Sequence, residues 1–176
     1  MDPSLSPSPV LTELKTRARL RLNGSRRELD EEAAADLRLR DCLNLVAREV
    51  GFAHWEHARR VLGGLAEPGE DMGTFWHAPR TGILLNEWFA RSEEAQAALR
   101  RSPGGYLLPY RRQFVLVQHY FVRELGMDPQ DAAWEAIARD LVGGYGTPAW
   151  LALAQQRLRA PRESFEEARA GARAKA

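Results

Sequence analysis

The feature that most constrains the fold is the segment 104–126, GGYLLPYRRQFVLVQHYFVRELG, the longest aromatic and β-branched run in the chain. Residues 106–110 suit an extended strand in which Pro109 indicates an edge or a bend. Residues 113–117 form a short apolar run compatible with a buried strand. The apolar spacing then changes to that of a helix that ends at the final glycine. The apolar face of this helix comprises Val117, Tyr120, Phe121 and Leu125.

The first third of the chain predicts three helices. The first carries Leu11, Leu14 and Ala18 at helical spacing and ends at residues 23–25. The second covers roughly residues 30–50, with acidic residues at its start. The third covers residues 53–62 and is followed by a glycine pair. Trp55, Ala58 and Leu62 form its apolar stripe.

The second half alternates ambiguous apolar runs with clear helix starts. Residues 74–77 suggest a short strand, whereas residues 82–90 and 113–117 fit either a strand or a helix. Ser92 begins a helix with acids in its first turn. Asp128-Pro129 and Thr147-Pro148 each predict another helix. Their stripes are Trp134, Ile137, Ala138 and Leu141, and Trp150, Leu153, Ala154 and Leu158.

These elements predict a dominantly helical α+β fold, in which a three-helix module precedes a small sheet flanked by helices. An all-α fold is the alternative if the two ambiguous runs are helical. The expected organisation is a disordered leader at 1–9, a helical module at 10–64, a linker at 65–73, an α+β domain at 74–160, and a frayed or disordered tail at 161–176.

The charge balance argues against a nucleic acid or membrane partner. The chain has 25 basic and 24 acidic residues, and its net charge is +1, so no global field favours an anionic surface. No apolar run approaches the length of a membrane span. Cys42 is the single cysteine, which excludes an intrachain disulfide and fits a reducing cytoplasm. We expect it to be a small buried hydrophobe.

Residues 43–62 carry the sharpest local pattern of the chain. A helix ending in Ala-Arg-Glu-Val-Gly and followed by a second helix is similar to a helix-turn-helix, but the inward positions of the second helix would be His57 and Arg60, which are polar. With Arg59 these residues offer a weak basic face for phosphates, so DNA binding is the third functional hypothesis.

Metal binding is a further hypothesis for the same helix. His54 and His57 at a spacing of three residues, with Glu56 or Asp71, are possible ligands. Because the sequence lacks an HExxH motif and paired Cys or His clusters, we predict no metal site and no cofactor.

The same pattern supports a resemblance. A leucine-rich helix, Ala-Arg-Glu, Gly-Phe and a tryptophan that opens the next helix resemble a short helical module found in front of glyoxalase-like and ankyrin-like domains of bacterial proteins. The resemblance covers residues 10–63. Residues 74–160 resemble an uncharacterised bacterial family. They contain neither an ankyrin repeat nor a glyoxalase ligand pattern, so the usual downstream function of the module does not carry over.

The second half also contains a mixture of aromatic and charged residues that suits a pocket for a small anionic or planar ligand. The candidate ligand-binding residues are Trp76, His77, Glu87, Tyr106, Tyr110, Arg111 and His119. Arg80, Asn86, Trp88, Arg112 and Gln113 belong to the same mixture. His77 with Glu87 is the first pair to consider for acid–base chemistry.

No catalytic constellation emerges from these patterns. We therefore expect a non-enzymatic cytoplasmic binding or protein-interaction protein. The alternative is a small-ligand-binding domain or small enzyme with a pocket around Trp76, His77, Glu87 and Arg111.

Overall fold

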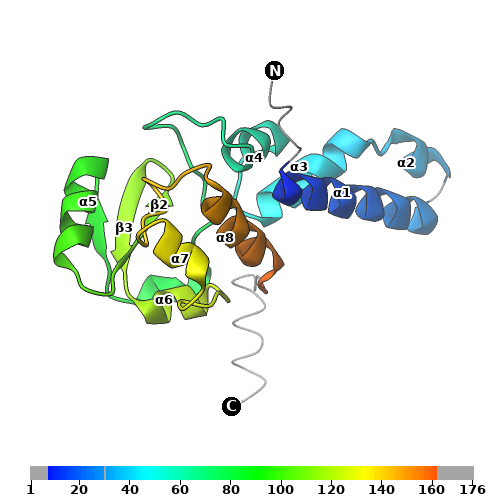
Figure 1. Cartoon of the computed structure of the whole chain (residues 1–176). Coiled ribbons are helices and arrows are strands. Elements are labelled where there is room, and N and C mark those ends of the chain that lie inside the picture. The colour runs from blue at the N-terminus through cyan, green and yellow to red at the C-terminus, as the bar shows by residue number, and fades with distance from the viewer. Residues whose placement is uncertain (1–7, 30, 162–176) are drawn as a thin grey trace, which may run out of the picture. The chain divides into compact units, whose positions relative to one another are not determined.

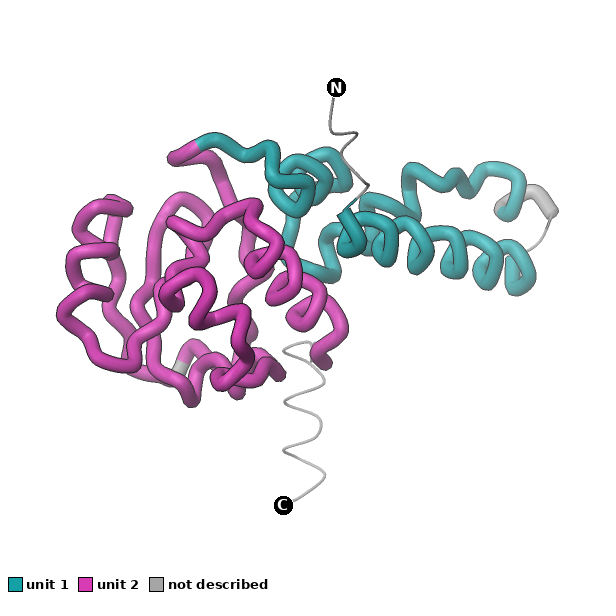
Figure 2. The backbone as a smooth tube through the Cα atoms, in the orientation of Figure 1, with its two compact units in different colours: residues 1–67 teal, residues 68–176 magenta. Residues whose placement is uncertain are grey.

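The computed structural model describes residues 8–29 and 31–161, which form a dominantly helical α+β fold with one small antiparallel sheet (Figure 1). The chain divides into two compact units, with the boundary between Glu67 and Pro68 (Figure 2). Within the described ranges, no helix has both the length and the apolar character needed to cross a membrane. The predicted leader and tail lie largely outside the described residues, although the first helix already begins at Pro9.

In its described residues, 8–29 and 31–67, the first unit has helices and no strand. The helices are α1 (Pro9–Glu28), α2 (Glu31–Asp36), α3 (Leu39–Glu49) and α4 (Trp55–Leu62). Helix α1 packs on α3, and α3 packs on α4. The predicted apolar positions Leu14 and Ala18 of α1 are fully buried, as are Ala58 and Leu62 of α4. The periodicity therefore identified the inward faces of these two helices.

Two predicted boundaries in this unit are wrong. Helix α1 continues through residues 23–25 to Glu28, because one helical glycine costs only about 1 kcal/mol and does not by itself end a helix. The predicted helix 30–50 is split into α2 and α3. At the break Arg38 is extended, and its backbone N–H donates to the carboxylate of Asp41 at 3.1 Å. This bond satisfies a backbone donor at the start of α3.

The second unit combines a sheet with helices on both faces. Its elements are η1, a 3-10 helix (Pro79–Ile83), β1 (Glu87–Phe89), α5 (Ser92–Arg101), β2 (Tyr106–Tyr110), β3 (Gln113–Val117), α6 (His119–Glu124), α7 (Ala132–Ala136) and α8 (Pro148–Arg159). The strand order is β1-β3-β2, and both pairings are antiparallel. Helix α5 lies on one side of the sheet, and α7 and α8 lie on the other (Figure 1).

The sheet resolves the two ambiguous runs. Residues 113–117 are β3, and residues 82–90 contain the end of η1 and the edge strand β1. The all-α alternative is therefore wrong. Leu107 of β2 also forms a parallel bridge with Asp140. The Leu107 N–H donates to the Arg139 carbonyl at 2.8 Å, and the Leu107 carbonyl accepts from the Leu141 N–H at 3.0 Å.

Three local predictions in the second unit are also wrong. Residues 74–77 form a turn, closed by a hydrogen bond from the His77 N–H to the Thr74 carbonyl at 3.0 Å, and not a strand. Tyr120 is 38 % exposed, so it does not belong to the buried face of α6. The helix expected from Asp128 begins only after Asp131, whose side chain accepts from the Ala133 N–H and caps α7.

The apolar stripe predicted after Thr147-Pro148 is confirmed in α8. Thr147 caps α8 by accepting from the Trp150 N–H. Trp150, Leu153, Ala154 and Leu158 are all buried. The same stripe contains Arg157, which is only 1 % exposed. A fully buried arginine was not predicted from the sequence. Its guanidinium donates to the carbonyl of His77, one of the candidate site residues.

Candidate functional site

The sheet register decides which of the candidate residues share a face. Trp88 and Leu108 both pair with Val115, so these three side chains lie on one face. Tyr110 is two residues beyond Leu108 and joins them, because side chains two apart on a strand point to the same side. Strand β1 and the β2–β3 hairpin therefore bring the rings of Trp88 and Tyr110 together.

Glu87 lies on the opposite face. It pairs with Leu116, one residue away from the Trp88 pairing, and successive strand residues point in opposite directions. His77 contacts Tyr110, on the other side of the sheet. The proposed His77–Glu87 acid–base pair is consequently wrong: strand alternation separates the two side chains.

Tyr110 is the centre of a group that we call the Tyr110 cluster, formed by His77, Trp88, Tyr110 and Arg111. The ring centroid of Tyr110 lies 5.3 Å from Trp88 and 5.0 Å from His77, and both contacts are edge-on. The Cζ atom of Arg111 lies 5.7 Å from the centroid of the same ring. Because Trp88 is 46 % exposed and Arg111 is exposed, the cluster reaches the surface.

Arg111 is held in place by its backbone. It occupies the turn between β2 and β3 with φ at 51°, in the left-handed region. Its N–H donates to the Gly73 carbonyl at 2.8 Å, and its carbonyl accepts from the Met72 N–H at 2.9 Å. These two bonds fix the turn, so the guanidinium is presented over Tyr110 by a constrained backbone.

Arg157 supports the cluster from the interior. Its guanidinium donates to the carbonyls of Phe75 at 3.1 Å, Leu125 at 3.0 Å and His77 at 3.1 Å. Burial, with a smaller contribution from the charge of Arg80, lowers the pKa of Arg157 to about 10. The group thus stays charged at neutral pH and ties the 75–77 turn to α6 and α8.

His77 connects this interior network to the surface cluster. The ring is half-buried, and burial followed by the nearby Arg157 charge lowers its pKa below the ordinary value of 6.5. The neutral form is therefore favoured at pH 7. A neutral imidazole packed between Tyr110 and Phe121 acts as an aromatic support for the exposed part of the cluster.

The remaining candidate residues lie elsewhere. Trp76 is a core residue, 2 % exposed, with its ring against Phe75 and Trp150. His119 is exposed on α6, next to Tyr120. Neither contributes to the Tyr110 cluster through a contact among the described residues, so the expected seven-residue pocket does not form.

Tyr106 belongs to a second group at the other end of β2. Its hydroxyl donates to the Pro129 carbonyl at 2.9 Å, and its ring packs edge-on against Trp134 with centroids 5.0 Å apart. The Cζ atom of Arg139 lies 5.3 Å from the Tyr106 centroid. Tyr106 itself is 2 % exposed, so this end of the strand is closed by packing.

Arg139 lines two hollows, of about 370 Å³ and about 430 Å³. Ala138 and Arg139 have φ values of 51° and 59°. Left-handed backbone at a residue other than glycine costs about 1–3 kcal/mol and concentrates at functional sites. Sequence analysis missed this region because it assigned Ala138 to the stripe of a longer helix.

Arg157 is the other residue that was not predicted, although the sequence contains a signal for it. In α8 it occupies a position of the apolar stripe, three residues after Ala154 and four after Leu153. A charged residue at an inward position predicts a buried, hydrogen-bonded group.

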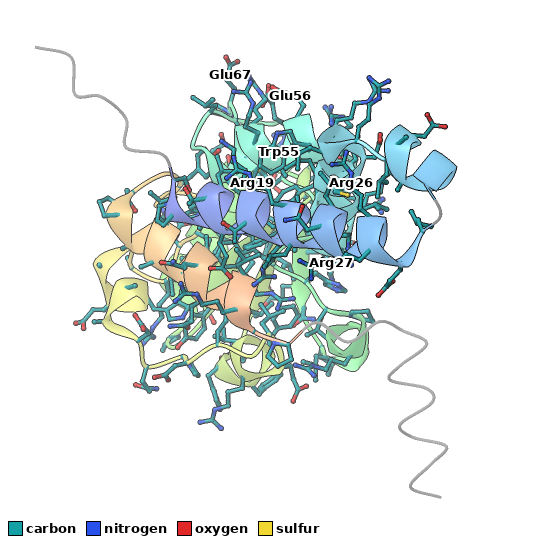
Figure 3. All side chains as sticks on the ribbon, turned by 90° about the vertical axis from the view of Figure 1, so that its right-hand side faces the viewer. Arg19, Arg26, Arg27, Trp55, Glu56 and Glu67 are labelled. Atoms are coloured by element: carbon teal, nitrogen blue, oxygen red, sulfur yellow. The ribbon has the colours of Figure 1, made fainter. Side chains whose placement is uncertain are left out.

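The hypotheses for α4 concern the first unit alone, where Figure 3 shows Trp55 and Glu56 on this helix. Glu56 accepts from Arg59 at 2.6 Å, which lowers the pKa of the carboxyl. His54 caps the helix by accepting from the His57 N–H at 3.2 Å. His57 in turn accepts from the Ala53 N–H. One ring nitrogen of each histidine is thus engaged by backbone.

Among the residues that the structure describes, no group of three or more His, Cys, Asp or Glu side chains is placed to hold a metal ion. Comparisons with protein families, with curated proteins and with solved structures found no match to this chain. The resemblance of residues 10–63 to the helical module therefore stays a prediction, as does DNA binding by α4.

Proposed function

We propose that this chain is a non-enzymatic binding protein that docks an extended, acidic segment of a partner protein on the Tyr110 cluster. The observation that carries the proposal is the exposure of Trp88, 46 %, in contact with Tyr110 and beside a constrained arginine. Tryptophan, tyrosine and arginine are the residue types that dominate binding energy at protein interfaces.

The shape of the surface favours an extended segment. Trp88 lies on β1, which is one of the two edge strands of the sheet, and an edge strand can add a strand from a partner. Leu85, just before β1, is 91 % exposed. An extended segment along residues 85–89 would cover this leucine and Trp88 together.

The charge of the surface favours acidic side chains in that segment. Arg111 and Arg112 are both exposed, and neither has an ion pair with a described residue. The nearby Asp71 carboxylate accepts from the Gly73 N–H at 2.7 Å. A partner carboxylate would meet arginines whose charge is not already paired, which gives specificity and faster association.

The alternative pocket around Trp76, His77, Glu87 and Arg111 has less support, because Trp76 lies in the core and Glu87 lies on the other sheet face. A reducing cytoplasm remains part of the proposal. It rests on Cys42, the single cysteine of the chain, which is 1 % exposed.

A random peptide display library tests the proposal. Enriched sequences should combine Asp or Glu with an apolar residue, and a synthetic peptide of that sequence should bind the full chain saturably. Trp88→Ala should weaken its binding at least about tenfold, as expected for a central aromatic anchor. Tyr120→Ala is the matched control, since it removes another exposed aromatic ring and should leave affinity unchanged. Equal binding by the Trp88 variant would refute the proposal.

A further inference from the structure

The larger of the two hollows beside Arg139 is lined by several polar and charged residues. It measures about 430 Å³ and lies between the end of α5, the turn before β2 and the left-handed segment. Its lining residues are Gln96, Leu99, Arg100, Ser102, Gly104, Gly105, Ala138, Arg139 and Asp140. We propose that this hollow binds a small organic anion through the phosphate or carboxylate group that its two arginines recognise.

Neither arginine of the hollow is paired directly with an acid in the described part of the chain. Neither Arg100 nor Arg139 has a carboxylate partner among the described residues. Guanidinium groups present several N–H donors in a plane and bind phosphates and carboxylates through paired hydrogen bonds. Two arginine residues lining one hollow favour an oxyanion over a neutral or cationic ligand.

Asp140 is the acid of this hollow, and the chain already uses both of its oxygens. Oδ1 accepts from the N–H groups of Val142 at 2.9 Å and Gly143 at 2.8 Å. Oδ2 accepts from the Gln96 side chain at 2.9 Å. Asp140 therefore orders the wall of the hollow through its neighbours, and its charge is stabilised by donors other than the two arginines.

Arg139 has left-handed backbone, and a hydrogen bond to strand β2 holds this conformation. The Arg139 carbonyl accepts from the Leu107 N–H at 2.8 Å, and its N–H donates to the Trp134 carbonyl at 2.7 Å. The guanidinium lies over the Tyr106 ring. Backbone and ring together limit the positions that the side chain can adopt, which reduces the ordering cost of binding.

The size of the hollow favours a small molecule. Pockets for small ligands and cofactors are about 300–1,000 Å³, and this hollow falls within that range. Leu99 provides an apolar wall beside the two arginines. A ligand with a compact oxyanion and an apolar or sugar-sized remainder matches this lining.

Titration of the full chain with inorganic phosphate and with succinate, at constant ionic strength, tests the proposal. Binding is read from the arginine Nε–H resonances and by calorimetry. We expect saturable binding of at least one anion, and a loss of about tenfold or more in affinity in Arg139→Gln and in Arg100→Gln. Arg101→Gln is the matched control, because Arg101 is exposed next to Arg100 but does not line the hollow.

Each outcome has a defined meaning. Saturation by phosphate alone identifies a phosphate ligand, and saturation by succinate alone identifies a carboxylate ligand. Weak, unsaturable shifts that are equal in the wild type and in both lining variants overturn the proposal. Arg100→Gln keeps the test valid if Arg139→Gln unfolds, since Arg100 is exposed on a helix. Trp88→Ala should not alter anion binding, so failure of the peptide proposal is distinguishable from failure of this one.

Discussion

The two ends of β2 carry the same arginine–tyrosine contact in different surroundings. At one end Arg111 lies over Tyr110, and at the other end Arg139 lies over Tyr106. Both arginines have left-handed backbone. Tyr106 is closed in by Trp134, whereas Tyr110 is covered by Trp88, which is 46 % exposed. The two arginine–tyrosine pairs therefore differ in their surroundings, and we propose that the exposed pair belongs to a docking surface while Arg139 lines a hollow.

The largest expected effect comes from removing the interior support of the open end. Arg157→Met leaves three carbonyls without their donor, those of Phe75 and Leu125 in buried hydrogen bonds and that of His77 in a partly buried one. Each unsatisfied buried polar group costs about 1 kcal/mol or more, so we expect a loss of about 3 kcal/mol in the free energy of unfolding. Urea denaturation measures it. Arg123→Met, an exposed change on α6, should stay within about 0.5 kcal/mol, and equal losses for both variants would contradict the role of Arg157.

The next largest effect is a difference in stability between the phenylalanine variants of Tyr106 and Tyr110. Tyr106→Phe removes the donor to the buried Pro129 carbonyl and should cost about 1–2 kcal/mol. Tyr110→Phe should cost less than about 0.5 kcal/mol, because the Tyr110 hydroxyl makes no hydrogen bond with the described chain. Denaturation of the two variants side by side checks this. Similar costs would mean that the two ends are packed alike.

A smaller effect tests the strain at the closed end. Ala138→Gly should stabilise the chain by about 0.5–1 kcal/mol, because glycine adopts positive φ without the clash that Ala138 carries. Ala138 is exposed, so the lost methyl group removes little packing. Thermal unfolding is a sufficient readout, and a lower midpoint temperature would show that this backbone is not strained.

We expect the smallest effect from the pH dependence of His77, because the ring is only half-buried. Its folded pKa is lowered, so the unfolded chain binds the proton more readily. The contribution of the neutral ring is fully present above pH 6.5 and is lost as pH falls through the folded pKa. Stability of the wild type relative to His77→Gln should therefore decrease below pH 6.5. Parallel pH profiles for the two proteins would contradict this.

Local signals in the sequence predicted the parts of the fold that depend on local energetics. The Thr147 cap and the apolar stripe of α8 each act within a few residues, so the local sequence predicts them. The apolar run 113–117 was compatible with a strand, which the structure confirms, but its pattern did not exclude a helix. The class of the fold followed from these elements. The sequence also contained a signal for Arg157, a charge within an apolar stripe.

The candidate site depended on distant pairings, and there sequence reasoning was less successful. Glu87 was separated from His77 by a register that only the pairing of β1 with β3 determines. The left-handed path at Ala138 and Arg139 is maintained by hydrogen bonds to Leu107 on β2, about thirty residues earlier in the sequence. Helical spacing alone predicted that the helix would continue.

Chemical-shift mapping is the sharpest test of whether the Tyr110 cluster recognises an acidic extended segment. A peptide selected from the display library would be titrated into the ¹⁵N-labelled full chain. We expect the largest shifts on residues 85–89, on Arg111 and Arg112, and on the indole N–H of Trp88. Shifts concentrated elsewhere, for example around Tyr120 on α6, with the Trp88 indole unmoved, would contradict it.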